Sequence, residues 1–348
     1  MPKVERDGVA DAWVERETER LRRRFDRLLA GLPASLAAAS PPLCSRIKIG
    51  GLGLRHWADQ FSPLVRLYPL LQAQGSSRAE LALARKAAVA HLALLAHAFI
   101  EDRRLDRQIE LLPAEALLSQ RLLLEGLARL RRLAFGAARL EAWVRRLTDR
   151  FAWAQAAQYD GLPRQAGATE PSLARAYGRL AAGRSAFGSI AVVAWAIAGG
   201  RPAATIRSLL AAFDDLALGL QLIDDLTDWP DDLLNARPNF LALAWSARRR
   251  RTLAPPKTRQ AAIRHGAEFM RLGIFGQAFT EATRAFDRAL AFQRRRGCPR
   301  LARLIAARQA HARRMAEDWL AAMARQLGGA APGPRCQNST VENFETAE

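Results

Sequence analysis

The sequence predicts an all-α protein, built as a single bundle of about ten helices. Apolar residues recur with the helical period almost throughout, and the strong helix formers Ala, Leu and Arg dominate the composition. Strand signals are nearly absent, because runs of Val, Ile, Thr and Tyr are few and no Asn-Gly or Asp-Gly pair lies between alternating segments. These observations favour a helical bundle over any fold that contains a large sheet.

Helix start and stop signals give the elements in order. A first helix is expected over about 10–31, ending at Gly31-Leu32-Pro33, and a loop follows that contains Pro41, Pro42, Gly50, Gly51 and Gly53. The later helices are expected over about 78–110, 114–134, 137–159, 171–182, 185–199, 203–229, 258–271, 275–296 and 299–327. Pro or Gly residues mark the breaks between them, as at Pro113, Gly199-Gly200, Pro255-Pro256 and Gly297.

The domain organisation follows from length and composition. The 348 residues fit either two domains or one large helical domain, and no repeat with a period of 20–50 residues is visible. We expect one domain over 1–327. The segment 328–348 is polar and rich in Pro and Gly, so we expect a disordered tail there.

The chain is strongly basic, with a formal net charge of +19. Of its 53 basic residues only four are lysines, Lys3, Lys48, Lys86 and Lys257, and this ratio partly reflects genome composition. The charge suits an anionic ligand, and phosphates are the commonest kind. No nucleic-acid-binding signature accompanies it, so no specific nucleic-acid partner is expected.

Other features exclude several classes of protein. Three distant cysteines (Cys44, Cys298, Cys336) provide neither a disulfide framework nor a zinc site. The charged start lacks the apolar stretch of a signal peptide, and the longest apolar run, Phe187 to Ala198, is shorter than the roughly 20 residues of a membrane span. We therefore expect a cytoplasmic protein with no transmembrane segment.

One acidic pair extends the apolar stripe of a helix. Leu92, Leu95 and Phe99 form the stripe, and continuing it by three and then four residues leads to Asp102 and Asp106. These carboxylates therefore lie on the side of the helix that faces the core. Alone, such a pair is typical of a surface salt-bridge ladder.

A second acidic cluster repeats this pattern. Phe213, Ala217 and Leu220 mark a stripe whose next steps of four are three acidic residues, at positions i, i+4 and i+8: Asp224, Asp228 and Asp232. Pro230 should bend this helix or end it near residue 229, which weakens the prediction for Asp232.

Stacked buried carboxylates repel one another, so protonation, arginine pairing or a divalent cation must offset their charge. Mg²⁺ suits such a site because it takes oxygen ligands, needs one or two carboxylates per ion, and completes its shell with water and substrate phosphate.

With these two clusters, the chain resembles the class I isoprenoid synthase superfamily over about 85–245. This superfamily contains trans-prenyltransferases, squalene/phytoene-type synthases and terpene synthases. The resemblance implies an all-α fold around a central cavity, with two aspartate-rich motifs that hold Mg²⁺, three ions in the family, against an allylic prenyl diphosphate. Asp102 and Asp106 resemble the first motif. Asp224, Asp225 and Asp228 resemble the second, which in its terpene-synthase form is matched by Asp224, Asp228 and Asp232.

The resemblance also implies substrate contacts. Arg184 follows Gly183 where prenyltransferases have a Lys-Thr pair, and Gly188 then corresponds to the helix break beside the substrate. The other matching positions are Gln155, Gln158 and Asp160 in QAAQYD, Arg179 as a diphosphate sensor, Arg237 and Asn239 in NARPNF, and Phe99, Phe187, Trp195 and Phe213 as cavity walls, although each aromatic is individually more typical of an ordinary core residue.

The sequence departs from the family pattern at three points. The first motif has Glu101-Asp102 where prenyltransferases have two aspartates. The Gly-Lys-Arg signature for a second diphosphate is absent, and only Arg55 and His56 lie in the nearest text. The C-terminal Arg-Tyr pair of many bacterial terpene synthases is also missing.

The leading hypothesis is therefore a Mg²⁺-dependent terpene synthase that ionises a prenyl diphosphate and then cyclises it or eliminates a proton, with Asp102, Asp224 and Arg184 as catalytic residues. The alternative is a prenyl-chain transferase or a head-to-head condensing enzyme. A basic helical nucleic-acid-binding or scaffold protein and an inactive family member are further readings. A homodimer is left open.

Overall fold

A computed structural model describes residues 11–49, 52–53, 56–106, 108–134, 138–158, 170–237 and 239–328. The tail predicted over 328–348 lies, apart from Gly328, outside the described residues.

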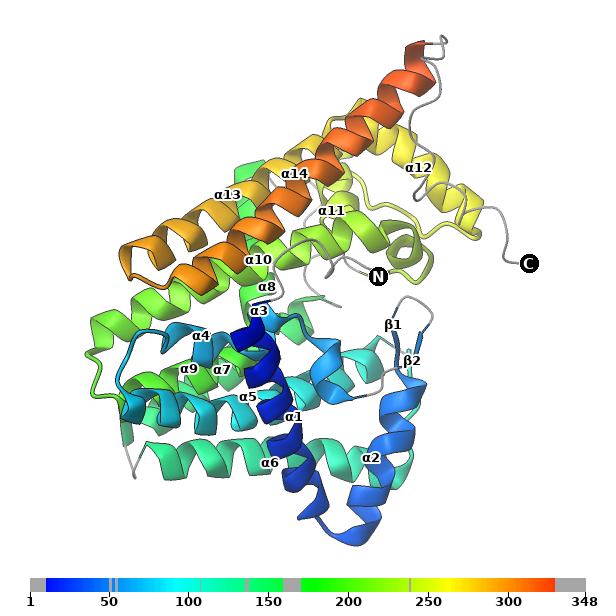
Figure 1. The fold of residues 1–348 in the computed structure, drawn as a ribbon. Helices are drawn as coiled ribbons and strands as arrows, with labels where there is room; N and C mark the ends of the chain where they lie inside the picture. The colour runs from blue at the N-terminus through cyan, green and yellow to red at the C-terminus, as the bar shows by residue number, and fades with distance from the viewer. Residues whose placement is uncertain are drawn as a thin grey trace.

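The described part of the chain is almost entirely helical, which confirms the predicted fold class (Figure 1). Its α-helices are α1 (Ala12–Ala30), α2 (Ala34–Arg46), α3 (Pro63–Arg66), α4 (Tyr68–Gln72), α5 (Arg78–Leu105), α6 (Pro113–Leu133), α7 (Ala138–Ala156), α8 (Glu170–Arg184), α9 (Ala186–Ala198), α10 (Ala203–Leu234), α11 (Phe240–Arg249), α12 (Arg259–Arg271), α13 (Ile274–Arg295) and α14 (Pro299–Gly328). A 3-10 helix, η2 (Trp57–Gln60), and an antiparallel pair of two-residue strands, β1 (Lys48–Ile49) and β2 (Leu52–Gly53), complete it.

Several boundaries differ from those expected. The loop predicted after Pro33 contains α2, which includes Pro41 and Pro42 and buries Leu43 and Cys44. Helix α5 ends at Leu105 instead of near 110, and α11 was not predicted at all. Short elements of this kind carry too little periodicity to be read from sequence, and their stability comes from tertiary packing.

Helix α10 runs through Pro230 to Leu234, so the prediction that it ends near 229 is wrong. Pro230 has no backbone N–H and cannot donate the helical hydrogen bond, and packing around Trp229 offsets this loss. The indole of Trp229 makes edge contacts with the rings of Phe269 and Phe275 at centroid distances of 5.7 and 5.9 Å. The helix continues because both Trp229 and Pro230 are buried on this face.

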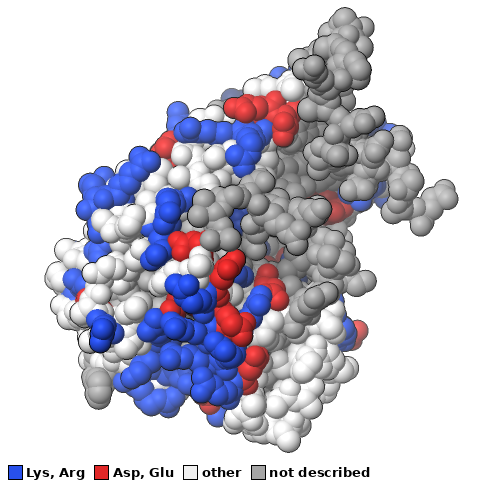
Figure 2. Space-filling view, viewed as in Figure 1, with Lys and Arg blue, Asp and Glu red and all other residues white. Residues whose placement is uncertain are grey.

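Charge on the visible surface is unevenly distributed. Figure 2 shows Lys and Arg gathered over α1 and the elements beside it, whereas the surface over α2 is largely uncharged.

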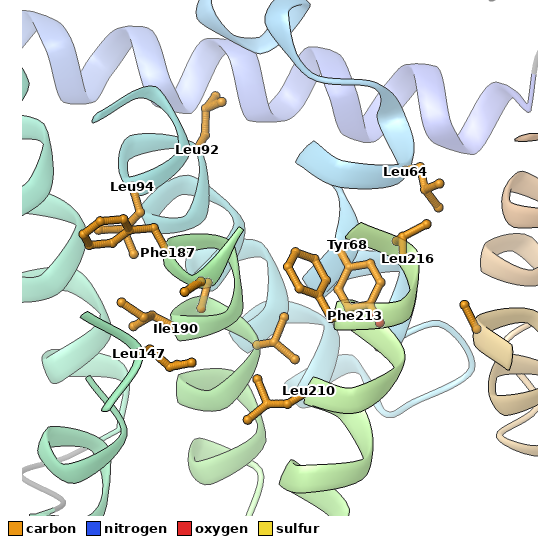
Figure 3. Close-up of a cluster of buried hydrophobic side chains, with 14 of the residues drawn as sticks. Leu64, Tyr68, Leu92, Leu94, Leu147, Phe187, Ile190, Leu210, Phe213 and Leu216 are labelled. Carbon is orange, nitrogen blue, oxygen red and sulfur yellow. The ribbon is translucent and has the colours of Figure 1, made fainter. Parts of the chain in front are cut away.

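The core lies between α5, α9 and α10. Helix α5 packs against α6, α9 and α4, and α10 packs against α13 and α8. Figure 3 shows Phe187 and Ile190 of α9, Phe213 and Leu216 of α10, and Tyr68 of α4 in this core. The rings of Tyr68 and Phe213 meet edge to face at 4.7 Å. Figure 1 shows α13 and α14 as an antiparallel pair, in which α13 packs against α10 and α14 packs against α13.

Helix α5 is long and apolar enough to cross a membrane, but 78% of its most apolar window is buried inside the protein. The bent pair α8–α9 passes the same test of length and hydropathy when taken as one span. A buried core helix has these properties too, and α5 is positioned as one.

Candidate active site

The two acidic clusters lie at the carboxyl-terminal ends of their helices. Asp102 is in the last turn of α5, and Asp224, Asp228 and Asp232 occupy the last three turns of α10. A helix carboxyl end already carries partial negative charge, so these acids add to an unfavourable potential unless cations are close.

Arg184, the last residue of α8, lies between the two clusters. Its Nη2 donates to both carboxylate oxygens of Asp102, at 3.0 and 3.1 Å. Burial lowers the pKa of this guanidinium, but the charges of nearby acids, including Asp102, Asp106 and Asp224, raise it overall. One arginine thus interacts with acidic residues of both clusters.

Arg103 provides a second link. It belongs to α5, and its guanidinium lies over the ring of Phe99 at 4.9 Å from the centroid. Its positive charge acts to lower the pKas of Asp224 and Asp228 on α10, against larger effects that raise them. The ends of α5 and α10 therefore face each other across Arg184 and Arg103.

Within the second cluster, Asp224 and Asp228 have solvent-exposed side chains. Desolvation by the surrounding protein and repulsion by Asp228 and Asp225 nevertheless raise the pKa of Asp224 to about 7. The pKa of Asp228 is also raised, by burial and by Asp231. Both carboxylates are therefore open to water, while the surrounding protein disfavours their charged forms.

Asp225 points the other way and is 1% exposed. It accepts hydrogen bonds from the Tyr177 hydroxyl, from the backbone N–H of Phe240 at 2.7 Å, and from Gln221 at 2.9 Å. Burial raises its pKa to about 6, and the bonds from Tyr177 and Phe240 oppose this. Both oxygens of Asp225 are thus occupied, and the structure gives it a structural position, in contrast to the metal-ligand role that the DDxxD reading implied.

Residues that follow α10 contact Asp232, the third acid of the stripe. Asn239 is fully buried, caps α11 by accepting from the N–H of Leu241 at 2.8 Å, and donates to Asp232 Oδ2 at 2.9 Å. Arg237 lies 3.7 Å from Asp232 Oδ1. Burial and repulsion within the cluster raise the pKa of Asp232 to about 8, although the bond from Asn239 opposes the shift. Asn239 is thus already engaged within the protein, which does not favour the predicted diphosphate contact.

Solved structures of polyprenyl synthases share this arrangement of helices. A geranylgeranyl pyrophosphate synthetase from the archaeon Geoglobus acetivorans superposes with a TM-score of 0.65 at 15% identity, covering 85% of this chain and 97% of that one. A heptaprenyl diphosphate synthase from Staphylococcus aureus gives 0.65 at 15% identity, covering 85% and 98%. A polyprenyl synthase from Caulobacter crescentus, complexed with calcium and isoprenyl diphosphate, gives 0.63 at 15% identity, covering 86% and 96%.

The chain has the class I isoprenoid synthase fold. The recognition made from the two acidic clusters is therefore confirmed at the level of the fold. By sequence, no protein-family model and no characterised relative matches the chain.

Other residues predicted for the site lie elsewhere. Arg179 is exposed, and its guanidinium lies 5.9 Å from the centroid of the Trp153 ring on α7. That environment does not support a diphosphate-sensing role. The break between α8 and α9 falls at Ser185 and bends the chain by 66°. Gly188 is inside α9, where an added Cβ would lie 3.0 Å from Phe213, so its identity reflects close packing instead of a break.

The remaining residues predicted for the site have varied surroundings. Phe99 is partly buried and meets Phe61 edge to face at 6.0 Å. Gln155 and Gln158 are 8% and 2% exposed, and amide atoms of both have no hydrogen-bond partner in the structure. Asp160 lies outside the described residues. Phe187, Trp195 and Phe213 are buried core residues.

Sequence reasoning missed Tyr177 and gave Arg103 no role. Tyr177 is seven residues before Arg184, two turns along the same side of α8, and this spacing could have identified it as a neighbour of the site. Arg103 lies between Asp102 and Asp106 in the first motif, and its position over the ring of Phe99 could not be read from spacing.

Of the two residues nearest the missing second diphosphate signature, the structure describes His56. His56 Nε2 lies 3.0 Å from the carboxylate of Asp26. Arg55 lies outside the described residues.

The acidic residues that the structure describes suit a divalent cation that takes part of its ligand shell from water and substrate, and they do not form a complete set of protein ligands. Besides the enclosed Asp225, five carboxylates interact electrostatically with at least one of three arginines, Arg103, Arg184 and Arg237, so the acids outnumber the guanidinium groups; the five acids are Asp102, Asp106, Asp224, Asp228 and Asp232. In the described part of the chain no three His, Cys, Asp or Glu side chains converge on one point. Mg²⁺ takes one or two carboxylates and shares the rest of its shell with water and phosphate, which matches such a spread set.

Proposed function

We propose that the protein is a prenyl-chain transferase that ionises an allylic prenyl diphosphate and joins the prenyl group to a second isoprenoid diphosphate. The observation that carries this proposal is that the ends of α5 and α10 face each other across Arg184, within a fold shared with polyprenyl synthases. This is the alternative that the sequence left open, and the similar solved structures, which are polyprenyl synthases, support it over cyclisation.

In this proposal the carbon–oxygen bond of the allylic diphosphate breaks and its electron pair leaves with the diphosphate. Arg184 donates hydrogen bonds to the departing group, and Arg103 adds positive charge beside it. The double bond of the second substrate attacks the allylic carbon, and a proton is then lost. Mg²⁺, held by Asp102, Asp224 and Asp228, would supply further charge to the leaving group when bound. The aromatic pair of Phe61 and Phe99 shields the carbocation from water.

A terpene synthase is the second candidate, favoured by one specific observation. No Gly-Lys-Arg signature for a second diphosphate is present, and His56 in the nearest segment is paired with Asp26. One diphosphate substrate would then suffice.

The two candidates are distinguished by supplying geranyl, farnesyl or geranylgeranyl diphosphate with Mg²⁺, with and without isopentenyl diphosphate. We expect diphosphate release and longer prenyl products only when both substrates are present. Release from the allylic substrate alone, with a hydrocarbon or alcohol product, would instead establish the terpene synthase.

Asp224→Asn should abolish turnover, and Asp149→Asn on the exposed surface of α7 is the matched control. Equal activity of the two variants would contradict the proposed site.

A further inference from the structure

The outward face of α1 is unusually rich in positive charge. Five exposed arginines lie along it, Arg16, Arg20, Arg23, Arg24 and Arg27, which we call the α1 arginine face. Together with Asp26, all of them except Arg16 line a surface hollow of about 530 Å³. From Arg16 to Arg27 the helix rises about 16 Å.

Most of this charge is not neutralised within the protein. Arg20 is 2.6 Å from Glu17 and Arg23 is 3.7 Å from Glu19. Arg16, Arg24 and Arg27 make no ion pair with any residue in the described part of the chain. The face therefore presents an excess of guanidinium groups to a partner.

The orientation of α1 is fixed by its other side. Leu21, Phe25 and Leu28 are buried in the core, and Arg85 of α5 donates two hydrogen bonds to Glu17. The helix cannot turn its apolar side outward, so it can bind a partner through charge but cannot insert as an amphipathic helix does.

The neighbouring surface is uncharged. Helix α2 packs against α1, and Arg46 at its end is its one charged residue. Apart from Arg46, its exposed positions are small or apolar, namely Ala34, Ser35, Ala38, Pro41, Pro42 and Ser45. Figure 2 shows this neutral area near the basic one, with a narrow band of acidic side chains between them.

We propose that the α1 arginine face docks the protein peripherally on a bilayer that contains anionic phospholipid. Guanidinium groups pair with lipid phosphates, and the neutral surface of α2 approaches the head groups without the cost of desolvating charge. A nucleic acid fits less well, because the arginines are not interleaved with exposed aromatic side chains on which bases could stack. The purpose of this contact rests on the proposed function, since prenyl diphosphates and their products are amphiphiles.

Co-sedimentation with vesicles tests the inference. The full chain is incubated with vesicles of phosphatidylcholine alone or with about 30% phosphatidylglycerol, at about 50 mM salt, where surface charges are weakly screened. The variant Arg16→Gln/Arg24→Gln/Arg27→Gln is compared with Arg207→Gln/Arg294→Gln/Arg295→Gln on α10 and α13. Both variants remove three exposed arginines, so they have the same net charge.

We expect the wild type and the control to sediment with the anionic vesicles only. The α1 variant should lose about a hundredfold in partition constant, because each arginine near an anionic surface contributes about fivefold. Circular dichroism checks that both variants are folded.

Three results would overturn the inference. They are failure of the wild type to bind anionic vesicles, equal losses in the two triple variants, and loss of binding to a single-stranded RNA oligonucleotide without any change in vesicle binding. Sedimentation requires no turnover, so an inactive protein that binds vesicles contradicts only the proposed function, and an active protein that ignores them contradicts only this inference.

Discussion

Neighbouring residues of the second acidic cluster have opposite environments. Asp224 and Asp228 are open to solvent, whereas Asp225 is enclosed by donors from Tyr177 and Phe240. An adjacent pair of aspartates thus divides into one residue that can receive a ligand and one that holds α8, α10 and α11 together.

This division predicts different effects on stability. Asp225→Asn should lower the free energy of unfolding by about 2 kcal/mol, because an amide cannot accept from all three donors and a buried donor is left unpaired. Asp228→Asn should change it by less than about 0.5 kcal/mol, since it removes an exposed charge from a repulsive cluster. Urea unfolding measures both. Equal losses would show that the two carboxylates are not divided in this way.

Arg184 and Arg179 give a second contrast at this scale. Arg184→Gln should reduce kcat by about 100-fold or more, because it removes the cation that lies between the acidic clusters. Arg179→Gln should leave kcat within about twofold, because its guanidinium lies over Trp153 at the surface. The assay is diphosphate release from the substrate that proves active. A large effect at Arg179 would restore its role as a diphosphate sensor.

The spacing of Asp224, Asp228 and Asp232 could be predicted from sequence because a helix places i, i+4 and i+8 on one side. The hydrogen bonds made by Asp225 and Asn239 could not be predicted from sequence. Two of the three donors to Asp225 are 48 and 15 residues away in the chain, and their approach depends on how α8 and α11 pack.

At the scale of elements, long periodic helices were predictable and short ones were not. Helices α5 and α13 follow stripes of apolar residues over many turns. Helices α2 and α11 have 13 and 10 residues, and α2 contains two prolines, so they depend on contacts that no local pattern shows. The same dependence on packing carries α10 past Pro230.

Close helix contacts at this scale depend on glycine. At Gly219 of α10, an added Cβ would lie 2.7 Å from the ring of Phe286, which is fully buried on α13. At Gly178 of α8, the nearest atom would be Leu218 Cδ2 at an ordinary 3.7 Å.

Gly219→Ala should therefore destabilise the protein by about 1–3 kcal/mol through overpacking. Gly178→Ala should stabilise it by about 0.5–1 kcal/mol, because alanine favours the helix. Thermal unfolding compares the two. A neutral Gly219→Ala would mean that α10 and α13 can separate without cost, contrary to their packing in the core.

At the scale of the whole molecule, a chain of net charge +19 encloses a site with an excess of carboxylates. The outer charge attracts anionic diphosphates over a distance of about a Debye length, and the inner charge requires cations. The positive exterior and the acidic site therefore serve different partners, because the first attracts the phosphates of the substrate and the second supplies ligands for metal ions.

The inner charge makes stability depend on pH and Mg²⁺ together. Asp224 and Asp232 have pKas raised to about 7 and about 8, so the folded protein holds their protons more tightly than the unfolded chain does. Their contribution to stability is present at low pH and declines as pH rises through these values. Mg²⁺ needs the ionised form, so its stabilising effect should grow over the same range.

The measurement is the rise in Tm caused by saturating Mg²⁺ at about pH 6.5 and about pH 8.5. Both values lie above the range in which His91, whose pKa burial lowers to about 4, would gain a proton in the folded state. We expect a larger rise at the higher pH, reaching the equivalent of about 2.7 kcal/mol at a Mg²⁺ concentration 100 times its Kd. Asp224→Asn/Asp228→Asn should abolish this rise, and Asp149→Asn should preserve it. A rise that is the same at both pH values, or that persists in the double variant, would place the cation outside the acidic ends of α5 and α10.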